Sequence, residues 1–299
     1  MTESPFRGVM PAVTTPFRDD LSVDVELLAR HVGWLVANGA SGIIPLGSLG
    51  EGATLDFEEK RTVLSTCVAA AGTAPVTPGV SALSTAQAVR LAREAEGLGC
   101  RGLMALPAYV HNGKWHETRA HFGAVLAATP LPCMLYNNPI AYGTDVTPEQ
   151  VASLAERHPN LVAVKESSGD VRRVTGIRAA TGDRISVLVG LDDMILEGLA
   201  AGASGWVAGL VNALPAESVR LFELGSAGSR EQALQLYRWF LPLLRLDTVP
   251  EFVQLIKLVQ AEVGMGSENV RPPRLRLPPE DRDAALRTIR AALEQRPGR

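Results

Sequence analysis

Eight short apolar runs punctuate the sequence, and amphipathic segments with helical periodicity separate them. Near-continuous apolar runs are typical of strands in a parallel sheet that is covered by helices. The runs are GVMPAVTTPF (8–17), GIIPLG (42–47), APVTPGVS (74–81), RGLMALP (101–107), PCMLYNNP (132–139), LVAVKESS (161–168), ISVLVGLD (185–192) and SGWVAGL (204–210). Eight strand–helix units predict an α/β fold of the (β/α)8 barrel (TIM barrel) type. An open doubly wound sheet is the alternative, but it usually has fewer strands, and no G-x-G-x-x-G follows a strand here.

Helix start signals support this alternation. Residues 56–59, 84–87 and 147–150 have the spacing of capping boxes, in which an N-cap side chain and the side chain three residues later satisfy backbone N–H groups. After about residue 214 the strand-like runs stop and the pattern becomes helical. We therefore predict a barrel over 1–225 and a C-terminal helical extension over 226–299, packed on the barrel or on a partner subunit.

Composition excludes several classes of protein. The 299 residues carry a net charge of −3, so there is no basic excess to bind nucleic acid. No apolar run approaches the roughly 18 residues of a membrane span, and the first residues lack the pattern of a signal peptide. Cys67, Cys100 and Cys133 are far apart in apolar stretches, which indicates reduced core thiols. These features predict a cytoplasmic protein.

One lysine lies where barrel enzymes place their chemistry, at the carboxyl end of a strand. Lys165 directly follows four apolar residues in LVAVKESSG (161–169). A lysine enclosed by a barrel is desolvated, which disfavours the charged ammonium, and a neutral amine can attack a carbonyl carbon. The alternative is a structural lysine whose ammonium reaches solvent from the strand end.

Three hydroxyl side chains, those of Tyr136, Tyr109 and Ser48, also follow predicted strands. A phenol can relay protons to or from a bound oxygen or carbanion, although a single tyrosine in such a place is more often structural. Gly47 and Gly50 bracket Ser48, so backbone N–H groups and the hydroxyl can approach a bound carboxylate. The alternative for this segment is an ordinary strand-to-helix turn.

The sequence contains no recognisable metal-binding pattern. His111, His116 and His121 are five residues apart and would point in different directions on a helix. Neither H-E-x-x-H nor a Cys/His cluster at ligand spacing occurs. Asp192 and Asp193 follow a predicted strand, where paired carboxylates more often cap a helix than bind a cation. We expect no metal site.

Four motifs, in their order along the chain, resemble those of one superfamily. They are VMPAVTTPF (9–17), GSLGE (47–51), LYNNP (135–139) and KESSG (165–169). On these motifs the chain resembles the dihydrodipicolinate synthase / N-acetylneuraminate lyase superfamily over essentially its whole length. The resemblance implies a (β/α)8 barrel with a helical C-terminal extension, a homotetramer, and a small 2-oxo acid or cyclic imine as substrate. It also implies a covalent lysine imine that needs no metal or organic cofactor.

The resemblance gives individual residues their roles. Lys165 matches the Schiff-base lysine, and Tyr136 matches the tyrosine that shuttles protons at the imine carbon and the substrate oxygen. Ser48 matches the hydroxyl residue of the glycine-rich turn. Tyr109 matches a tyrosine that, in the synthases, reaches the site of a neighbouring subunit to complete a proton relay. The candidate substrate contacts are Gly47, Ser48, Leu49, Gly190 in VGLDD, and Val207 in GWVAG.

Two positions depart from the synthase pattern. Leu49 replaces the second threonine of the turn, which removes a hydroxyl and makes that part of the pocket apolar. In the synthases, the tract after LYNNP carries an arginine that grips the carboxylate of the second substrate, and Ala141 occupies the matching position here. Alanine cannot offer the bidentate grip of arginine. The sequence therefore argues against 4-hydroxy-tetrahydrodipicolinate synthase activity.

A closer resemblance is to the bacterial 1-pyrroline-4-hydroxy-2-carboxylate deaminases of hydroxyproline degradation. The shared segments are TDVTPE (144–149), KESSGDVRR (165–173), VGLDD (189–193), GWVAG (205–209) and PLLRLD (242–247). We therefore expect this cyclic imine to be converted to 2,5-dioxopentanoate and ammonia. The alternatives are the synthase, another pyruvate-dependent aldolase or lyase, and, in a different class, a barrel that binds a ligand without catalysis.

Overall fold

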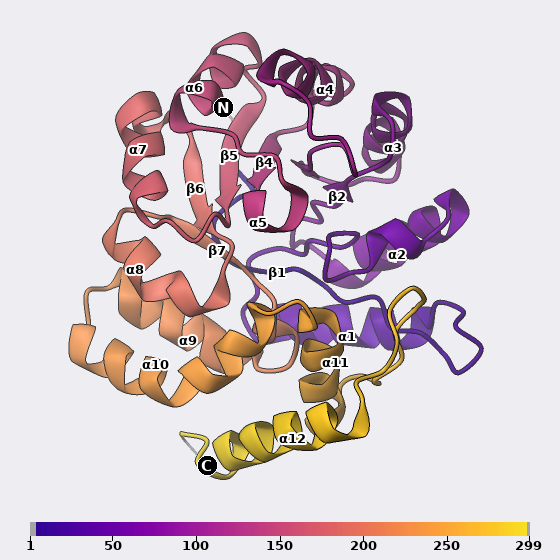
Figure 1. Ribbon diagram of the computed structural model, residues 1–299, viewed down its shortest axis with the longest axis vertical. Coiled ribbons are helices and arrows are strands. Elements are labelled where there is room, and N and C mark those ends of the chain that lie inside the picture. Colours follow the sequence, from indigo (N-terminus) through magenta and orange to yellow (C-terminus); the bar gives the residue numbers. More distant parts are fainter. Residues whose placement is uncertain (1–3, 298–299) are drawn as a thin grey trace.

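The computed structural model describes residues 4–297 and has parallel strands at its centre with helices around them (Figure 1). Neighbouring strands follow the order β1-β7-β6-β5-β4-β3-β2, and every pair is parallel. The strands are β1 (Gly8–Pro11), β2 (Gly79–Val80), β3 (Leu103–Ala105), β4 (Cys133–Asn137), β5 (Leu161–Glu166), β6 (Ser186–Val189) and β7 (Gly205–Ala208). The predicted α/β barrel is confirmed.

The second apolar run differs from its prediction, because it forms isolated bridges where a full strand was expected. Ile44 pairs in parallel with Ala12, and Ile43 pairs in parallel with Val76. The run therefore fills the gap between β1 and the segment that leads into β2, and it closes the barrel. Pro45 follows the two paired residues and has no N–H to donate, which limits the length of the ladder.

Helices connect the strands and cover the outside of the barrel (Figure 1). They are α1 (Val25–Ala37), α2 (Phe57–Ala71), α3 (Thr85–Gly97), α4 (Trp115–Ala127), α5 (Pro139–Tyr142), α6 (Pro148–Arg157), α7 (Arg172–Thr181), α8 (Ile195–Ala200), α9 (Pro215–Ser226), α10 (Arg230–Leu244), α11 (Phe252–Glu262) and α12 (Pro279–Glu294). The last three form the C-terminal helices, with α10 against α9 and α12. The predicted boundary between residues 225 and 226 stays a prediction.

The three predicted helix starts are confirmed, two with a full capping box and the third with half of one. Asp56 and Thr147 each form a full capping box at the starts of α2 and α6. The Ser84 side chain accepts from the N–H of Gln87 at the start of α3. In α6, the buried residues Val151, Leu154 and Ala155 have the i, i+3, i+4 spacing of a stripe that faces the core. Local caps and periodicity thus fix where each helix begins and which face it buries.

The three cysteines are buried and unpaired, as the sequence predicts. Burial raises the pKa of the Cys100 thiol to about 12, so this group stays protonated at neutral pH. Among residues 4–297, no helix is long and apolar enough to cross a bilayer. The same residues include no cluster of three or more His, Cys, Asp or Glu side chains that would suit a metal ion.

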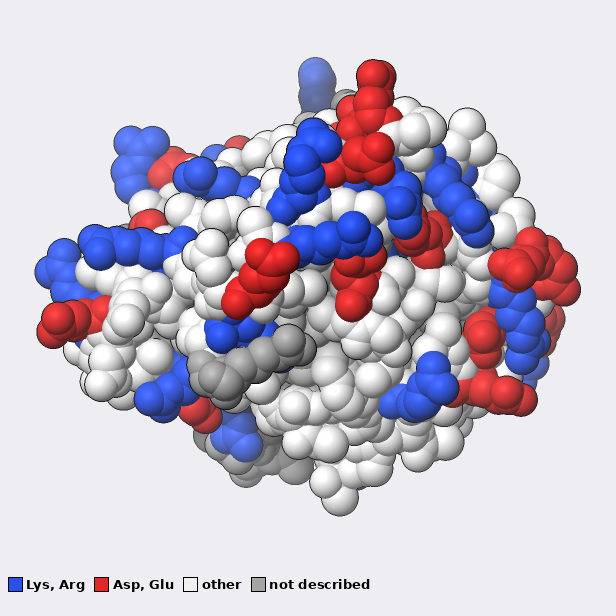
Figure 2. Space-filling view, turned by 90° about the horizontal axis from the view of Figure 1, so that it is seen from below, with Lys and Arg blue, Asp and Glu red and all other residues white. Residues whose placement is uncertain are grey.

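Acidic and basic side chains alternate over the face of the molecule that Figure 2 shows. Several of the surface charges are paired with each other, as in Arg282–Glu268 and Arg290–Glu262, at 2.7 and 2.8 Å. This face therefore offers a mixed surface and no continuous field of one sign.

Candidate active site

Lys165 and Tyr136 lie side by side near the carboxyl ends of adjacent strands. The parallel register of β4 and β5 pairs Tyr136 directly with Lys165. Lys165 is 7% exposed, and its Nζ lies 4.2 Å from the centroid of the Tyr136 ring. The electron-rich face of a phenol attracts an ammonium, so the ring holds the lysine head group in place without a carboxylate.

Space around the Lys165 side chain is provided by a glycine. A Cβ on Gly190, at the end of β6, would lie 2.6 Å from Cε of Lys165 and would also strike Oγ of Ser167. Only glycine therefore fits beside this lysine. Within residues 4–297, Nζ of Lys165 has no hydrogen bond or ion pair, and Oγ of buried Ser167 has no partner. The predicted substrate contact Gly190 thus touches the lysine directly.

Asn138 positions the phenol of Tyr136. Its Nδ2 donates to the Tyr136 hydroxyl oxygen at 2.9 Å, and its Oδ1 accepts from the N–H of Ala141 at 3.0 Å. The same side chain therefore caps the short helix α5 and fixes the phenol oxygen. Because this bond uses the oxygen as an acceptor, the hydroxyl hydrogen of Tyr136 stays available to another group.

Glu51 anchors the glycine-rich turn that carries Ser48. Buried Glu51 accepts from Nζ of Lys257 at 2.5 Å and from the N–H of Arg271 at 3.0 Å. A Cβ on Gly50 would lie 2.7 Å from the carbonyl oxygen of Val13, so the turn requires glycine there. Among the described residues, the backbone N–H groups of Ser48 and its neighbour Leu49 have no acceptor.

The other predicted contacts lie at different distances from Lys165. Leu49 is 3% exposed and Gly47 is also buried, both in the turn that presents Ser48. Val207 is buried in β7, two strands away from Lys165 in the sheet order. The roles proposed for these residues as substrate contacts stay predictions.

Tyr142 joins the site, although the sequence gave no reason to choose it. Its hydroxyl is hydrogen-bonded to Oγ of Ser48. Its ring centroid lies 5.8 Å from that of Tyr136 and 5.7 Å from that of Tyr109. The role expected for Tyr109 in a proton relay stays a prediction. The tyrosine ends α5, a single helical turn with no periodicity that would have marked an inward face.

The sequence analysis did not assign two buried carboxyl groups near Lys165, those of Asp192 and Asp247, to the site. Asp192 was expected to cap a helix, but it accepts from Nε1 of Trp206 at 3.0 Å and from the N–H of Leu210 at 2.7 Å, and it also accepts from Gly209. Asp192 lies in the segment that follows β6, and its hydrogen bonds therefore connect this segment to β7 and the residues just after it. Asp247, from the C-terminal helices, points toward Gly209, and its Oδ1 has no partner among the described residues.

Burial raises the pKa of Asp192 and that of Asp247, and the nearby charge of Lys165 opposes both shifts. Each carboxyl also disfavours ionisation of the other, because two like charges in a buried place repel. The pair therefore provides a place near Lys165 where a proton can reside.

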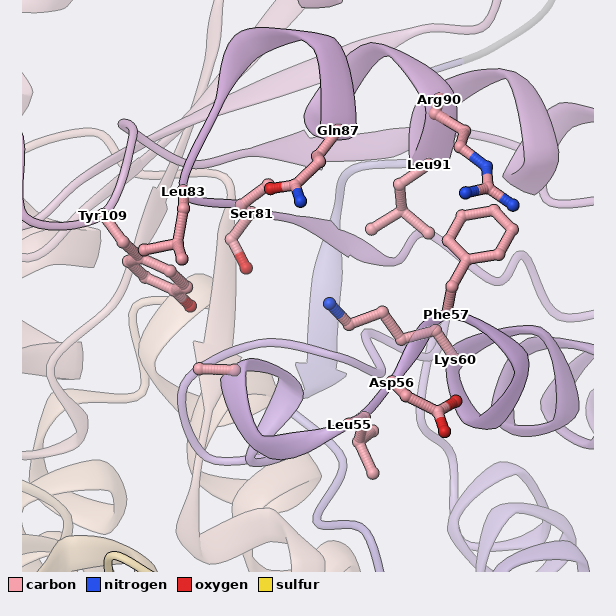
Figure 3. Close-up of a pocket in the computed structure, with 12 residues that line it drawn as sticks. Leu55, Asp56, Phe57, Lys60, Ser81, Leu83, Gln87, Arg90, Leu91 and Tyr109 are labelled. Atoms are coloured by element: carbon pink, nitrogen blue, oxygen red, sulfur yellow. The ribbon is translucent and has the colours of Figure 1, made fainter.

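A cavity of about 280 Å³ lies beside this site, with Tyr109 on its wall (Figure 3). The polar side chains around it include those of Lys60, Ser81, Gln87 and Arg90. Lys165 does not line this cavity. Tyr109 does, and its ring lies beside that of Tyr142, so Tyr109 lies between the cavity and the site.

The family model of the dihydrodipicolinate synthetase family matches residues 5–292. The chain belongs to this family. It is 33% identical over 269 residues to a 4-hydroxy-tetrahydrodipicolinate synthase of Pelobacter propionicus, which covers 90% of this chain and 92% of the relative. It is 37% identical over 275 residues to the enzyme of that name from Methanoculleus marisnigri, covering 90% and 93% of the two chains.

Solved structures of the family have the same fold. The crystal structure of dihydrodipicolinate synthase from Aquifex aeolicus matches with a TM-score of 0.92 and 27% identity, over 96% of this chain and 98% of that one. A prophage protein of the family from E. coli K12, solved in complex with pyruvate, matches with a TM-score of 0.91 and 25% identity, over 96% and 99%. The family is thus shown, whereas the expected deaminase activity gains no support, because the named relatives are synthases.

Proposed function

We propose that this family member is a Schiff-base lyase in which Lys165 forms an imine with the carbonyl carbon of pyruvate or a related 2-oxo acid. The observation that carries the proposal is the environment of Nζ, which is buried, unpaired among the described residues, and adjacent to a phenol and a glycine. A neutral amine there adds to the carbonyl carbon, and the carbonyl oxygen leaves as water.

The turn at Ser48 and Leu49 suits the carboxylate of such a substrate. Two backbone N–H groups without acceptors, together with the Ser48 hydroxyl, provide donors for an anionic oxygen. Tyr136 then moves protons at the imine carbon and at the neighbouring carbon, where the protonated imine acts as an electron sink. This chemistry calls for one amine and one phenol.

The first candidate for the complete reaction is that of 4-hydroxy-tetrahydrodipicolinate synthase. It is favoured by the names of relatives that are 33 and 37% identical over nine-tenths of the chain. Against it is the tract after β4, where a carboxylate-binding arginine would be needed and Ala141 is present.

The second candidate is the deamination of 1-pyrroline-4-hydroxy-2-carboxylate, which that same tract favours. In α5, Ile140 is 74% exposed, Ala141 is exposed, and Tyr142 turns toward Ser48, so the helix presents no cation to a second substrate. The deamination of a cyclic imine involves no second substrate, so no arginine is needed to bind a second carboxylate. Lys165 would attack C2 of this imine and open the ring to a C5 amine. Loss of the C3 proton and of the C4 hydroxyl as water would leave an enamine, which tautomerises to a C5 imine whose hydrolysis releases ammonia. Hydrolysis of the imine at Lys165 would then free 2,5-dioxopentanoate.

The experiment is a comparison of turnover with three purified proteins: wild type, Lys165→Ala and Ala141→Arg. Each is given the two substrates of the synthase and, separately, 1-pyrroline-4-hydroxy-2-carboxylate. Synthase product that depends on Lys165 supports the first candidate. A higher rate of its formation in Ala141→Arg would show that the missing arginine limits this activity. Lys165-dependent ammonia release supports the second. Product that survives the loss of Lys165 would overturn the Schiff-base proposal itself.

A further inference from the structure

Three neighbouring strands of the barrel end next to Lys165, and polar atoms gather around the residues that follow them. These residues are Ser167 after β5, Gly190 after β6 and Gly209 after β7, at the end of the barrel where such folds place their sites. A Cβ on Gly190 would strike Oγ of Ser167 and the Lys165 side chain. A Cβ on Gly209 would strike the carboxyl group of Asp247. Both glycines therefore leave room for a polar group at the mouth of the barrel.

Two of these polar groups lack partners although they are enclosed. Ser167 is 1% exposed, and its Oγ has no hydrogen bond within residues 4–297. Oδ1 of Asp247 is enclosed and unpartnered in the same range, and no hydrogen bond or ion pair reaches its other carboxyl oxygen there. Asp192 differs, because one indole N–H and two backbone N–H groups satisfy its carboxylate. Enclosed polar atoms without partners cost free energy, and a ligand that supplies partners to Ser167 and Asp247 removes this cost.

The charges around Asp247 favour a basic nitrogen as its ligand. Burial and the neighbouring Asp192 raise the pKa of Asp247, while the charge of Lys165 opposes the shift. Its carboxyl group can thus give a proton to a more basic group and then accept hydrogen bonds from that group as a carboxylate. A second anion there would meet the repulsion of Asp192, whereas an ammonium group would be attracted by both carboxyl groups. The electrostatics therefore suit an amine.

The place of Asp247 in the barrel relates it to one end of the substrate. In the proposed function, the substrate carboxylate lies at the turn of Ser48 and C2 lies at Nζ of Lys165. Tyr136 and Tyr142, on β4 and just after it, occupy one side of the lysine. The strands β6 and β7 lie on the other side, where Asp247 covers the residue that follows β7. This second side is therefore the one left for the carbons beyond C3.

We propose that Asp247 binds the far end of the substrate and so selects cyclic imines that open to a free amine. The inference rests on the second candidate of the proposed function. When Nζ of Lys165 replaces the ring nitrogen at C2, the bond between C2 and that nitrogen breaks. The nitrogen receives the two hydrogens of the neutral lysine amine and remains on C5 as a primary amine. This amine takes the carboxyl proton of Asp247, which leaves an ammonium and a carboxylate paired with each other. Ser167 contributes a second polar partner beside Lys165, and a 2-oxo acid without nitrogen gains nothing from Asp247.

The test compares two compounds with the same carbon chain. 1-Pyrroline-2-carboxylate opens on Lys165 to an imine with an amine at C5, and it lacks the C4 hydroxyl, so it cannot proceed to ammonia release. 2-Oxopentanoate forms an imine of the same length without nitrogen. Borohydride reduction and mass spectrometry of the intact protein give the concentration at which half of the protein carries each adduct. Wild type is compared with Asp247→Asn, which keeps the shape of the side chain and removes its charge.

In Asp247→Asn, we expect this concentration to rise by roughly tenfold or more for 1-pyrroline-2-carboxylate, because a charged, hydrogen-bonded pair is lost. For 2-oxopentanoate it should stay within about twofold of wild type. The midpoint of urea unfolding should be unchanged or higher, since the variant loses an unpartnered carboxyl that Asp192 repels. A residue with a structural role alone would instead lower that midpoint and affect both compounds equally.

Asp193→Asn is the matched control. It removes a carboxylate from the same region, one that pairs with Arg245 at 3.8 Å, and it should bind both compounds within about twofold of wild type. An unchanged value for 1-pyrroline-2-carboxylate in folded Asp247→Asn, or an equal loss for both compounds, would overturn the inference alone. A wild-type protein that traps 2-oxopentanoate but not the cyclic imine would do the same. A wild-type protein that traps neither compound and no pyruvate would overturn the proposed function together with the inference.

Discussion

Two lysines of this barrel are buried to nearly the same degree, yet their surroundings are opposite. Lys257, in α11, is 2% exposed and donates to Glu51 at 2.5 Å and to the carbonyl oxygen of Asn269 at 2.7 Å. Lys165 is 7% exposed and lies over a phenol ring, with no acceptor for its Nζ among the described residues. Burial alone therefore does not mark a nucleophile; an amine that lies beside a phenol and has no acceptor does.

Because their surroundings differ, the two lysines are expected to have different roles in the site. Lys257 neutralises Glu51 and so fixes the turn that presents Ser48, although burial lowers the pKa of Lys257. Lys165 has the space that Gly190 leaves beside it and the phenol of Tyr136. The first lysine is expected to act on stability and the second on chemistry, and the following changes test that division.

Replacing Lys165 by alanine should have the largest effect. Turnover should fall to the level of the reaction without protein, because no other group can form the imine. The fold should persist, since Lys165 forms no ion pair or hydrogen bond with any residue of the described range 4–297. Activity assays measure the loss of turnover, and circular dichroism checks that the variant is folded. Turnover above background in a folded variant would contradict the role assigned to Lys165.

Tyr136→Phe should come next, with turnover lowered by roughly 10²–10⁴-fold, the range typical of a group that transfers a proton. Imine formation should survive, because the ring that lies over Nζ is retained. Steady-state kinetics and borohydride trapping measure the two effects separately. Wild-type turnover would remove Tyr136 from the mechanism.

Lys257→Met should affect stability, with the free energy of unfolding lowered by on the order of 3–5 kcal/mol, because Glu51 would remain buried without its partner. Urea titration measures this loss. The double variant Lys257→Met/Glu51→Gln should lose less, since no charge is left alone. At saturating pyruvate, trapping per folded molecule should be unchanged, and a loss of trapping in folded Lys257→Met would show that this lysine also serves the chemistry.

His31 gives a smaller, pH-dependent test of the same structural region, because it contacts Gln260 one turn after Lys257 on α11. Burial lowers the pKa of His31 to about 4 from 6.5. The folded state therefore resists protonation, so wild type should lose stability as the pH falls from 6.5 to 4, by up to roughly 3 kcal/mol. Relative to wild type, His31→Gln should lose this part of the pH dependence in urea titrations at pH 4 to 7. An unchanged pH profile would contradict the assignment.

The sequence alone could predict the barrel, the helix starts and the main pair of the site. Apolar runs placed Lys165 and Tyr136 at the ends of neighbouring strands, and parallel pairing then brings them together. Yet FVQLIKLVQ surrounds Lys257 with apolar residues as well, so the pattern could not separate the two lysines. That difference depends on Glu51, which is 206 positions away along the chain.

Other parts of the site depend on geometry that no local pattern carries. The inward turn of Tyr142 follows from the cap at Asn138 and the left-handed Gly143. Asp192 was expected to cap a helix because two acidic residues follow β6. Its carboxylate instead accepts from the backbone N–H groups of Gly209 and Leu210, which follow β7. Asp247 reaches Gly209 only because the C-terminal helices fold back over the barrel.

The most direct test of the account is to reduce a mixture of wild-type protein and pyruvate with borohydride and to map the modified residue by mass spectrometry of peptides. The account predicts one adduct, on Lys165, that is absent from Lys165→Ala and fully retained in folded Lys257→Met. An adduct on Lys257, or one that persists in Lys165→Ala, would contradict it.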